Sequence, residues 1–204
     1  MPTFDLEHKI GGNVAGVDEV GRGPLAGPVM AAAVILNPDA IPMGLDDSKA
    51  LSEKKRLLVY PQILDMAIVG FGEASVAEID DINILRASHL AMVRAIANLG
   101  VSPDHVLVDG NLIPRDLDIP ATAVIKGDSK SLSIAAASIV AKIRRDRLMV
   151  DLAQQHPGYG WETNAGYPSK SHRLALQNLG VTPHHRRSFK PVHNILYQEK
   201  LPST

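Results

Sequence analysis

Four acidic residues stand where apolar segments of this sequence end near glycine. Asp18 and Glu19 end VAGVDE, Asp109 ends HVLVD, and Asp128 ends AVIKGD. Such short apolar runs predict buried β-strands. Because ligands bind at the carboxyl ends of strands in α/β sheets, we expect the four carboxylates to meet at one edge. Side by side they repel one another, and a divalent cation relieves this repulsion; an all-oxygen set suits Mg²⁺ or Mn²⁺ rather than zinc.

Each acid alone also fits a purely structural role. A strand-end Asp can cap a following helix or close an Asx turn. The adjacent pair, together with two further strand-end acids, favours the metal site.

The run GRGPLAG, residues 21–27, is a glycine-rich turn directly after the acidic pair. Gly21, Gly23 and Ala26 literally match the dinucleotide-binding fingerprint, which must open a helix. Prolines 24 and 28 bracket the run, and the next segment, PVMAAAVIL, is strand-like. The sequence therefore predicts a turn that lets a sugar–phosphate chain approach the backbone.

Three other residues are candidate substrate contacts. Arg22 lies within the glycine turn, and Lys49 follows Asp-Ser in a loop, where it can donate to phosphate or remain solvated. Tyr167, between a glycine and a proline, can stack on a base or sugar or pack locally. Trp161 is predicted to be a core residue.

The net charge of −1 hides an uneven distribution. Residues 1–122 hold 9 Lys/Arg against 17 Asp/Glu, whereas residues 123–198 hold 11 against 4. This predicts that the C-terminal part meets a polyanion, unless acids and bases pair across the fold. His184, His185 and His193, irregularly spaced in a cysteine-free chain, do not indicate zinc. With Arg186 and Arg187 they predict a basic, phosphate-facing or solvated segment.

The element pattern predicts an α/β fold with some antiparallel pairing. Strands are expected at 13–19, 28–36, 67–74, 105–110 and 122–128. Helices are expected at 53–66, from a capping box at Ser75 to Ala97, and at 131–155, 170–179 and 190–199. Pro61 should kink or divide the first helix.

The chain lacks a signal pattern, cysteines and any apolar run of about 18 residues, so a cytoplasmic protein without membrane contact is expected.

Six motifs in register resemble bacterial ribonuclease HII. They are GVDEVGRGPLAGPV, LDDSKALSEKKR, VLVDGN, KGDSKSLSIAAASIVAKIRRD, GYPSKSH and HHRRSF, and they extend from residue 16 to about 192. The resemblance implies a ribonuclease H-like fold, with a mixed central sheet flanked by helices. It divides the chain into a catalytic domain, 1–155, and a C-terminal helical extension, 156–204, that contributes to substrate binding. Pro61 interrupts a helix that is usually continuous in the family.

The resemblance also implies an endoribonuclease that cuts RNA in RNA–DNA hybrids and 5′ of single ribonucleotides in duplex DNA, leaving 3′-hydroxyl and 5′-phosphate ends. By motif, Asp18, Glu19, Asp109 and Asp128 hold two Mn²⁺ or Mg²⁺ ions, with Asp18 bridging them. One ion lowers the pKa of a water and the other stabilises the leaving oxygen. The implied substrate contacts are Gly21, Arg22, Gly23, Lys49 and Tyr167.

The protein is expected to be a monomer. Two alternatives remain at this point: another nuclease of the same fold, such as a junction resolvase or a processive ribonuclease H, and a non-catalytic hybrid-binding module.

Overall fold

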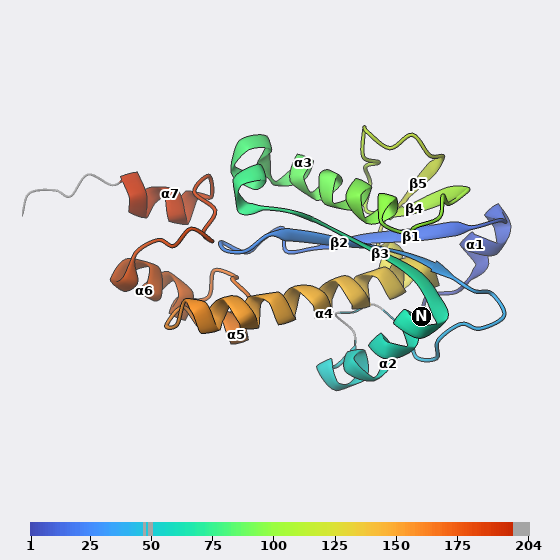
Figure 1. The fold of residues 1–204 in the computed structure, drawn as a ribbon, viewed down its shortest axis with the longest axis horizontal. Helices are drawn as coiled ribbons and strands as arrows, with labels where there is room; N and C mark the ends of the chain where they lie inside the picture. The colour runs from blue at the N-terminus through green and yellow to red at the C-terminus, as the bar shows by residue number, and fades with distance from the viewer. Residues whose placement is uncertain (47, 49–50, 198–204) are drawn as a thin grey trace, which may run out of the picture.

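The computed structural model describes residues 1–46, 48 and 51–197, which fold around one five-stranded sheet (Figure 1). Its strand order is β3-β2-β1-β4-β5. The strands are β1 (Val14–Val20), β2 (Val29–Leu36), β3 (Ala67–Ala74), β4 (His105–Asp109) and β5 (Ala121–Val124). β1 pairs antiparallel with β2 and parallel with β4. The mixed sheet confirms the expected α/β class.

Helices cover both faces of the sheet (Figure 1). One face packs against α3 (Val76–Ala97), and the other packs against α4 (Leu132–Gln155) and α2 (Glu53–Met66). The remaining helical segments are α1 (Asp5–Ile10), the short 3₁₀ helix η1 (Gly127–Ser129), α5 (Trp161–Asn164), α6 (Lys170–Leu179) and α7 (Lys190–Tyr197). No helix in the described ranges is both long and apolar enough to cross a membrane.

The long helix α4 lies directly against the central strand. A Cβ atom on Gly16 of β1 would overlap the backbone of Ser133 and Ile134. The small side chains at residues 135–138 of this helix are buried. Glycine and alanine therefore set how closely α4 approaches the strand that carries the acidic pair.

β5 and α3 differ from the sequence-based expectation. β5 ends at Val124, and Asp128 lies in η1 rather than at a strand end, because Lys126 adopts a left-handed conformation that turns the chain. α3 begins with the expected capping box but breaks at Asn83, whose φ is 69°. The side-chain oxygen of Asn83 then accepts from the backbone N–H groups of Leu85 and Arg86, restarting the helix.

Pro61 does not divide α2, which runs unbroken from Glu53 to Met66. α1 and α5, which span only 6 and 4 residues, were not predicted from the sequence.

The C-terminal segments gather beyond the end of the sheet where the β1–β2 turn projects (Figure 1). Trp161, 1% exposed, anchors a core there, as expected. This core joins Leu25 and Ala26 of the turn to Met149 of α4 and to α6 and α7. The glycine turn is thus packed into the C-terminal part of the protein. The division into domains 1–155 and 156–204 stays a prediction.

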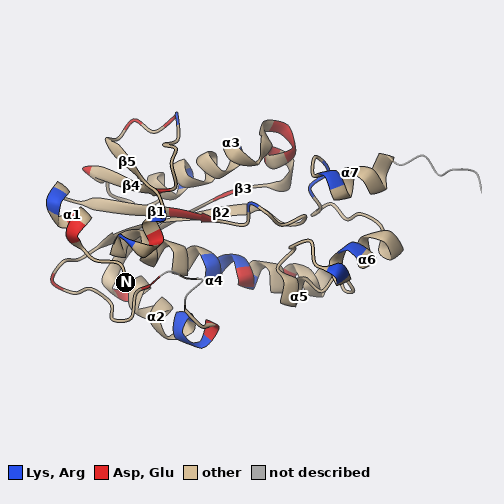
Figure 2. Ribbon diagram, turned by 180° about the vertical axis from the view of Figure 1, so that it is seen from behind, with Lys and Arg blue, Asp and Glu red and all other residues tan. Residues whose placement is uncertain are grey.

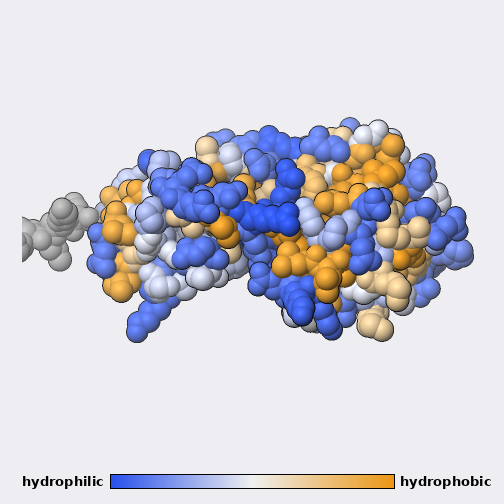
Figure 3. Space-filling model, turned by 60° about the horizontal axis from the view of Figure 1, so that its bottom comes forward, coloured by the Kyte–Doolittle hydropathy of each residue, from blue (hydrophilic) through white to orange (hydrophobic). Residues whose placement is uncertain are grey.

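The outer face over α2 carries exposed apolar side chains (Figure 3). Leu57, Leu58 and Leu64 are each more than 40% exposed.

Candidate active site

The acidic pair lies at the end of the central strand β1. Asp18 is 5% exposed, and its Oδ1 accepts from the Glu19 backbone N–H at 2.7 Å. Burial raises the pKa of Asp18 well above its ordinary value; the charges of Glu19 and Asp109 add to this, and a hydrogen bond from Ser138 opposes it. Burial also raises the pKa of Glu19, against the effect of Arg22 at 3.3 Å. The pair is thus held where negative charge is costly.

The other two acids are joined through Gly127. Asp109, the last residue of β4, accepts from the Gly127 backbone N–H at 2.6 Å. A Cβ on Gly127 would lie 3.1 Å from Asp109 Oδ1 and 2.5 Å from Ile134 Cδ1. Asp128, 5% exposed, follows in η1. The absence of a side chain at Gly127 lets η1 lie against the end of β4.

The four carboxylates lie close enough for their charges to interact. Glu19, Asp109 and Asp128 each raise the pKa of Asp18. Within residues 1–46, 48 and 51–197, however, no three His, Asp or Glu side chains converge tightly enough to enclose an ion. Three of the four carboxylates contact other groups: Asp18 contacts Ser138, Glu19 contacts Arg22, and Asp109 accepts from the Gly127 N–H. Hard oxygen donors and unrelieved repulsion fit a divalent cation such as Mg²⁺ or Mn²⁺.

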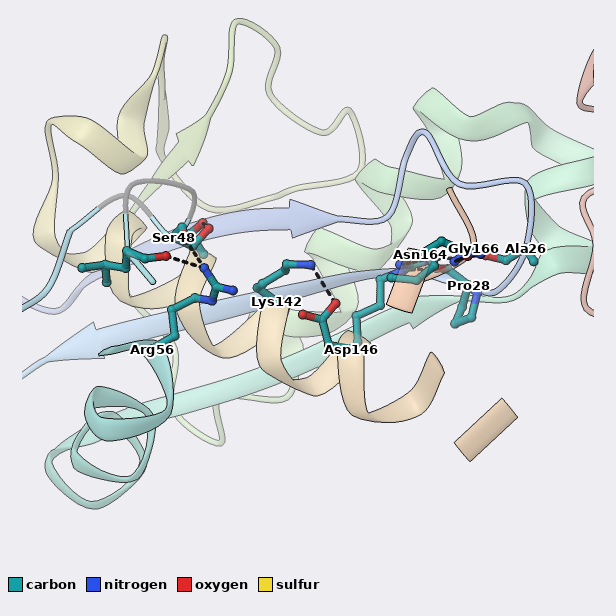
Figure 4. A network of polar contacts seen from close by, with 12 residues as sticks. Ala26, Pro28, Ser48, Arg56, Lys142, Asp146, Asn164 and Gly166 are labelled. Atoms are coloured by element: carbon teal, nitrogen blue, oxygen red, sulfur yellow. Dashed lines mark hydrogen bonds and ion pairs between the residues drawn. The ribbon is translucent and has the colours of Figure 1, made fainter. Parts of the chain in front are cut away.

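Two buried arginines hold the glycine turn. Arg145 of α4 donates to the carbonyl oxygens of Pro28, Ala165 and Ala26 at 2.9–3.1 Å. Figure 4 shows Ala26, Pro28 and Gly166 gathered beside the helix. Burial lowers the pKa of Arg145 to about 10, so the guanidinium stays charged at neutral pH. Its charge is met by oriented carbonyl dipoles.

Arg186 holds both ends of the same turn. It donates to the carbonyl oxygens of Gly21, Arg22 and Gly27 at 2.6–2.9 Å and lies over the ring of Phe189. Burial, followed by the nearby Arg145 charge, lowers its pKa to about 9. The expectation that residues 184–187 form a phosphate-facing or solvated segment is wrong for Arg186, at 0% exposure, and for His185, at 1%. Their side chains turn inward to satisfy the turn and the C-terminal core.

The expected substrate contacts in the turn are brought together with Tyr167. Gly21 has a φ of +94°, and a Cβ there would overlap Arg145. A Cβ on Gly23 would lie 3.4 Å from the Tyr167 ring, which is 42% exposed. The backbone N–H of Leu25 donates to Gly166 at 2.7 Å and joins the two loops. Gly23 and Tyr167 are therefore neighbours, both exposed to solvent, and a side chain at residue 23 would touch the ring.

A network of buried histidines contacts the backbone of Tyr167. Trp161 Nε1 donates to His172 Nε2, so His172 carries its proton on Nδ1 and donates to the Tyr167 carbonyl at 2.9 Å. The Thr182 N–H donates to His185 Nδ1, so His185 is protonated at Nε2, which points to His172 Nε2 at 3.1 Å. Both rings are neutral in this arrangement.

A hollow of about 200 Å³ opens beside the carboxylates. Its lining includes Glu19, Arg22, Asp109, His89 of α3 and Asn111 after β4. Burial, then the charges of Arg22 and Arg115, lowers the pKa of His89. The hollow is a polar recess of mixed charge next to the acidic edge.

Lys49 lies outside the described residues. Nearby, Arg56 of α2 donates to the carbonyl oxygens of Ser48 and Leu51 at 2.7 and 2.6 Å (Figure 4). The Ser48 hydroxyl contacts the Ser138 hydroxyl at 2.6 Å, and Ser138 in turn bonds Asp18. Ser48 and Leu51 are thereby tied to the acidic edge.

Sequence reasoning missed the supporting residues Arg145, Ser138, His89 and Asn111. Arg145 is one of several basic residues in the run KIRRDR, and nothing in that run marks it as buried. Arg145 is buried because it contacts the carbonyl oxygens of Ala26, Pro28 and Ala165, which belong to other segments of the chain.

This sheet order, with carboxylates at the end of its central strand, defines an α/β protein of the ribonuclease H-like class. The family model for ribonuclease HII matches residues 15–192. The chain belongs to the ribonuclease HII family. It is 67% identical to a ribonuclease HII of Ruegeria pomeroyi, over 98% of this chain and 87% of the relative, and 66% identical to that of Paracoccus denitrificans, over 92% and 89%.

Solved structures agree with this membership. The ribonuclease H2 of Pyrococcus horikoshii OT3 superposes with a TM-score of 0.76 at 27% identity, covering 91% of this chain and 98% of that one. A Bst ribonuclease HIII solved in complex with Mn²⁺ shares the fold, with a TM-score of 0.74 at 19% identity over 95% of this chain and 72% of that one.

Proposed function

We propose that Asp18, Glu19, Asp109 and Asp128 form the catalytic centre of this ribonuclease HII family member. As a member of the family, the protein is an endoribonuclease that hydrolyses the RNA strand of RNA–DNA hybrids. The observation that carries the site assignment is the concentration of buried negative charge at the end of β1, where neighbouring carboxylates raise the pKa of Asp18.

The proposed cofactor is a pair of divalent cations, Mn²⁺ or Mg²⁺, held by these four acids. Such ions supply Lewis-acid polarisation of a phosphoryl group and lower the pKa of water. The chain contributes the charged oxygens, and Ser138, Arg22 and Gly127 orient three of them. These orienting contacts limit the reorganisation needed to bring the oxygens together.

The glycine turn is the proposed reader of the ribonucleotide. A 2′-hydroxyl both donates and accepts, and main-chain groups of Gly21, Arg22 and Gly23 can meet it because no bulky side chain screens them. Tyr167, across from Gly23, would stack on the following sugar, and Lys49 would contact phosphate. Together they support incision on the 5′ side of a single ribonucleotide in duplex DNA, leaving 3′-hydroxyl and 5′-phosphate ends.

Asparagine substitutions test the acids. Asp18→Asn and Asp109→Asn should each lower cleavage by at least about 100-fold, because even groups that only orient metal ligands are worth about 10–100-fold. Nucleic-acid affinity should persist, since Asn keeps the side-chain size. Asp18→Asn should also melt at a higher temperature, because it removes one buried negative charge.

The assay uses a duplex with one ribonucleotide and a continuous hybrid, with Mn²⁺, with Mg²⁺ and with chelator. Asp65→Asn, an exposed acid on α2, is the matched control and should cleave like the unmodified protein. Near-normal turnover of Asp18→Asn at saturating metal would remove Asp18 from the proposed site. Binding without cleavage by the unmodified protein would favour a hybrid-binding module instead.

A further inference from the structure

The N-terminal helix α1 carries a buried acid that is not one of the four proposed metal ligands. Glu7 is 2% exposed, and its Oε1 accepts from the Ser131 hydroxyl at 2.6 Å and from the Ser133 N–H at 2.9 Å. Within the described residues, Glu7 Oε2 has no hydrogen-bond partner. A buried carboxyl group with one oxygen unsatisfied is costly, so its presence needs an explanation beyond solubility or helix propensity.

Glu7 acts on the segment that links η1 to α4. Ser131 is the N-cap of α4, and Ser133 lies in the first turn of that helix. The first turn of a helix has N–H groups without intrahelical acceptors. Glu7 supplies an acceptor for one of them and at the same time binds the capping hydroxyl, so it fixes where the 24-residue helix begins.

Other residues of the N-terminal segment also bind the segment that links η1 to α4. The Thr3 N–H donates to the Lys130 carbonyl, and the Leu132 N–H donates to the Thr3 carbonyl, both at 3.1 Å. Leu6 packs on the cluster of Val14, Leu107, Val124 and Ile134, which joins strands β1, β4 and β5 to α4. Residues 3–7 therefore clamp the link between the sheet and the helix.

Hydrogen bonds connect residues 3–7 through Ser131 and Gly127 to two of the proposed metal ligands. The Ser131 N–H donates to the Gly127 carbonyl at 2.8 Å, and the Gly127 N–H donates to Asp109 at 2.6 Å. Asp128 is the next residue after Gly127. A displaced Ser131 would let η1 move, and with it the side chain of Asp128 and the hydrogen bond that orients Asp109.

We infer that Glu7 is a positioning residue for the metal site, acting through Ser131 and η1 on Asp128 and Asp109. This rests on the proposed function of those acids. Glu7 lies outside residues 15–192, the part matched by the family model. The N-terminal segment thus completes a site whose ligands all lie within the matched region.

The test compares Glu7→Ala with Glu7→Gln. Glu7→Ala should weaken Mn²⁺ binding, measured by calorimetry, and lower kcat on a hybrid, each by about tenfold, with KM for the nucleic acid unchanged. Amide hydrogen exchange at residues 127–133 should quicken. Glu7→Gln should recover most of the loss, because its carbonyl oxygen can still accept from Ser131 and Ser133.

Two controls separate positioning from stability. Ile63→Val removes a buried methylene between α2 and α4 and should lower the melting temperature without changing metal affinity. Lys9→Gln alters an exposed residue of α1 and should change nothing. If Glu7→Ala loses only thermal stability, as Ile63→Val does, the inference is wrong. Should Glu7→Ala not be recovered folded, Ser131→Ala, which removes the donor to Glu7, takes its place with the same expected result.

Asp128→Asn separates the proposed role of Asp128 as a metal ligand from the proposed role of Glu7 as a positioning residue. If Asp128→Asn leaves metal affinity unchanged, the proposed role of Asp128 fails. If Asp128→Asn weakens metal binding but Glu7→Ala does not, only the role of Glu7 fails. If both weaken it, the Glu7→Ala, Asp128→Asn double variant should lose less affinity than the sum of the two single losses, because part of the action of Glu7 is on Asp128; fully additive losses would place the action of Glu7 elsewhere.

Discussion

Gly21 and Gly23 lie two residues apart in one turn but meet different surroundings. Gly21 has a positive φ, and its α-carbon lies against the buried Arg145. Gly23 has an ordinary φ and faces the accessible ring of Tyr167. Packing therefore requires glycine at position 21. At position 23, the absence of a side chain leaves open the space in which we expect substrate.

Alanine at each position separates folding from recognition. Gly21→Ala should destabilise the protein by more than about 1 kcal/mol, because the residue needs φ > 0 and Arg145 would have to move. Gly23→Ala should stay within about 0.5 kcal/mol, as surface changes usually do, yet lower cleavage of every ribonucleotide-containing substrate. Thermal melts and kcat/KM on both substrates measure this. Full activity of Gly23→Ala would exclude close main-chain approach at residue 23.

Tyr167 should matter most where RNA meets DNA. If its ring stacks on a deoxyribose after the ribonucleotide, Tyr167→Ala should reduce kcat/KM far more for a single-ribonucleotide duplex than for a long hybrid in Mn²⁺. Tyr167→Phe, which keeps the ring, should retain the preference. Equal losses on the two substrates would contradict a junction-sensing role.

The residue types at this site were largely predictable, but their supports were not. The acids and the glycine turn could be found because strand-end carboxylates and a proline-bracketed turn leave local patterns. Arg186 was misjudged, because an arginine in a basic run is ordinarily solvated. Its burial depends on carbonyl oxygens of Gly21, Arg22 and Gly27, about 160 positions away, which no local pattern reports.

At the scale of elements, the segment from Trp161 to Arg186 contains two buried histidines, His172 and His185, whose protonation affects the stability of the folded state. Burial lowers the pKa of His185 to about 3, with the charges of His172, His184 and His156 acting in the same direction. Burial also lowers the pKa of His172. Both rings are neutral when folded, whereas in the unfolded chain they bind protons below their ordinary value of 6.5.

Acid should therefore destabilise this part of the protein. The unfolded state takes up more protons as the pH falls from 6.5 towards 3, so stability is lost over that window, by about 2 kcal/mol from His185 alone at pH 5. Urea denaturation at pH 7.5 and pH 5 measures the loss. The His172→Gln, His185→Gln variant should show a smaller difference between the two pH values. An equal difference would assign the effect to other groups.

Element boundaries followed the sequence wherever a cap or a glycine marks them. The capping box at Ser75 and Glu78 begins α3, as expected, and α6 begins at Lys170, the predicted start, with Ser169 as its N-cap. The break at Asn83 could not be foreseen, because apolar spacing continues through it. The early end of β5 could not be foreseen either, because it depends on the left-handed conformation of Lys126 and on the contact between Gly127 and Asp109.

At the scale of the whole molecule, the basic residues of the C-terminal part divide into two groups. Arg145 and Arg186 are buried structural groups, whereas Lys170 and Arg173 of α6 and Arg187 are exposed. Figure 2 shows basic positions along α4 and α6. The charge available to a nucleic-acid backbone is therefore smaller than the sequence suggests.

Salt dependence tests this division. Lys170→Ala, Arg173→Ala should weaken binding to different duplex sequences alike, and flatten the slope of log affinity against log salt by about 1–2. Arg186→Ala should instead lower the free energy of unfolding by about 2–5 kcal/mol, since three buried carbonyl oxygens lose their donor. An unchanged slope in the double variant would place the phosphate contacts on other elements.

The carbonyl contacts of Arg186 also bear on how the protein is made. The turn at residues 21–27 leaves the ribosome early, but the guanidinium that fixes it follows 159 residues later. At about 5–20 residues per second, that interval lasts roughly ten to thirty seconds. During it, the strand carrying Asp18 can exist while the turn beside it lacks its shape. Each newly synthesised chain therefore passes through a period in which the turn lacks the three hydrogen bonds from Arg186, and we expect the turn to take its final shape only near the end of translation.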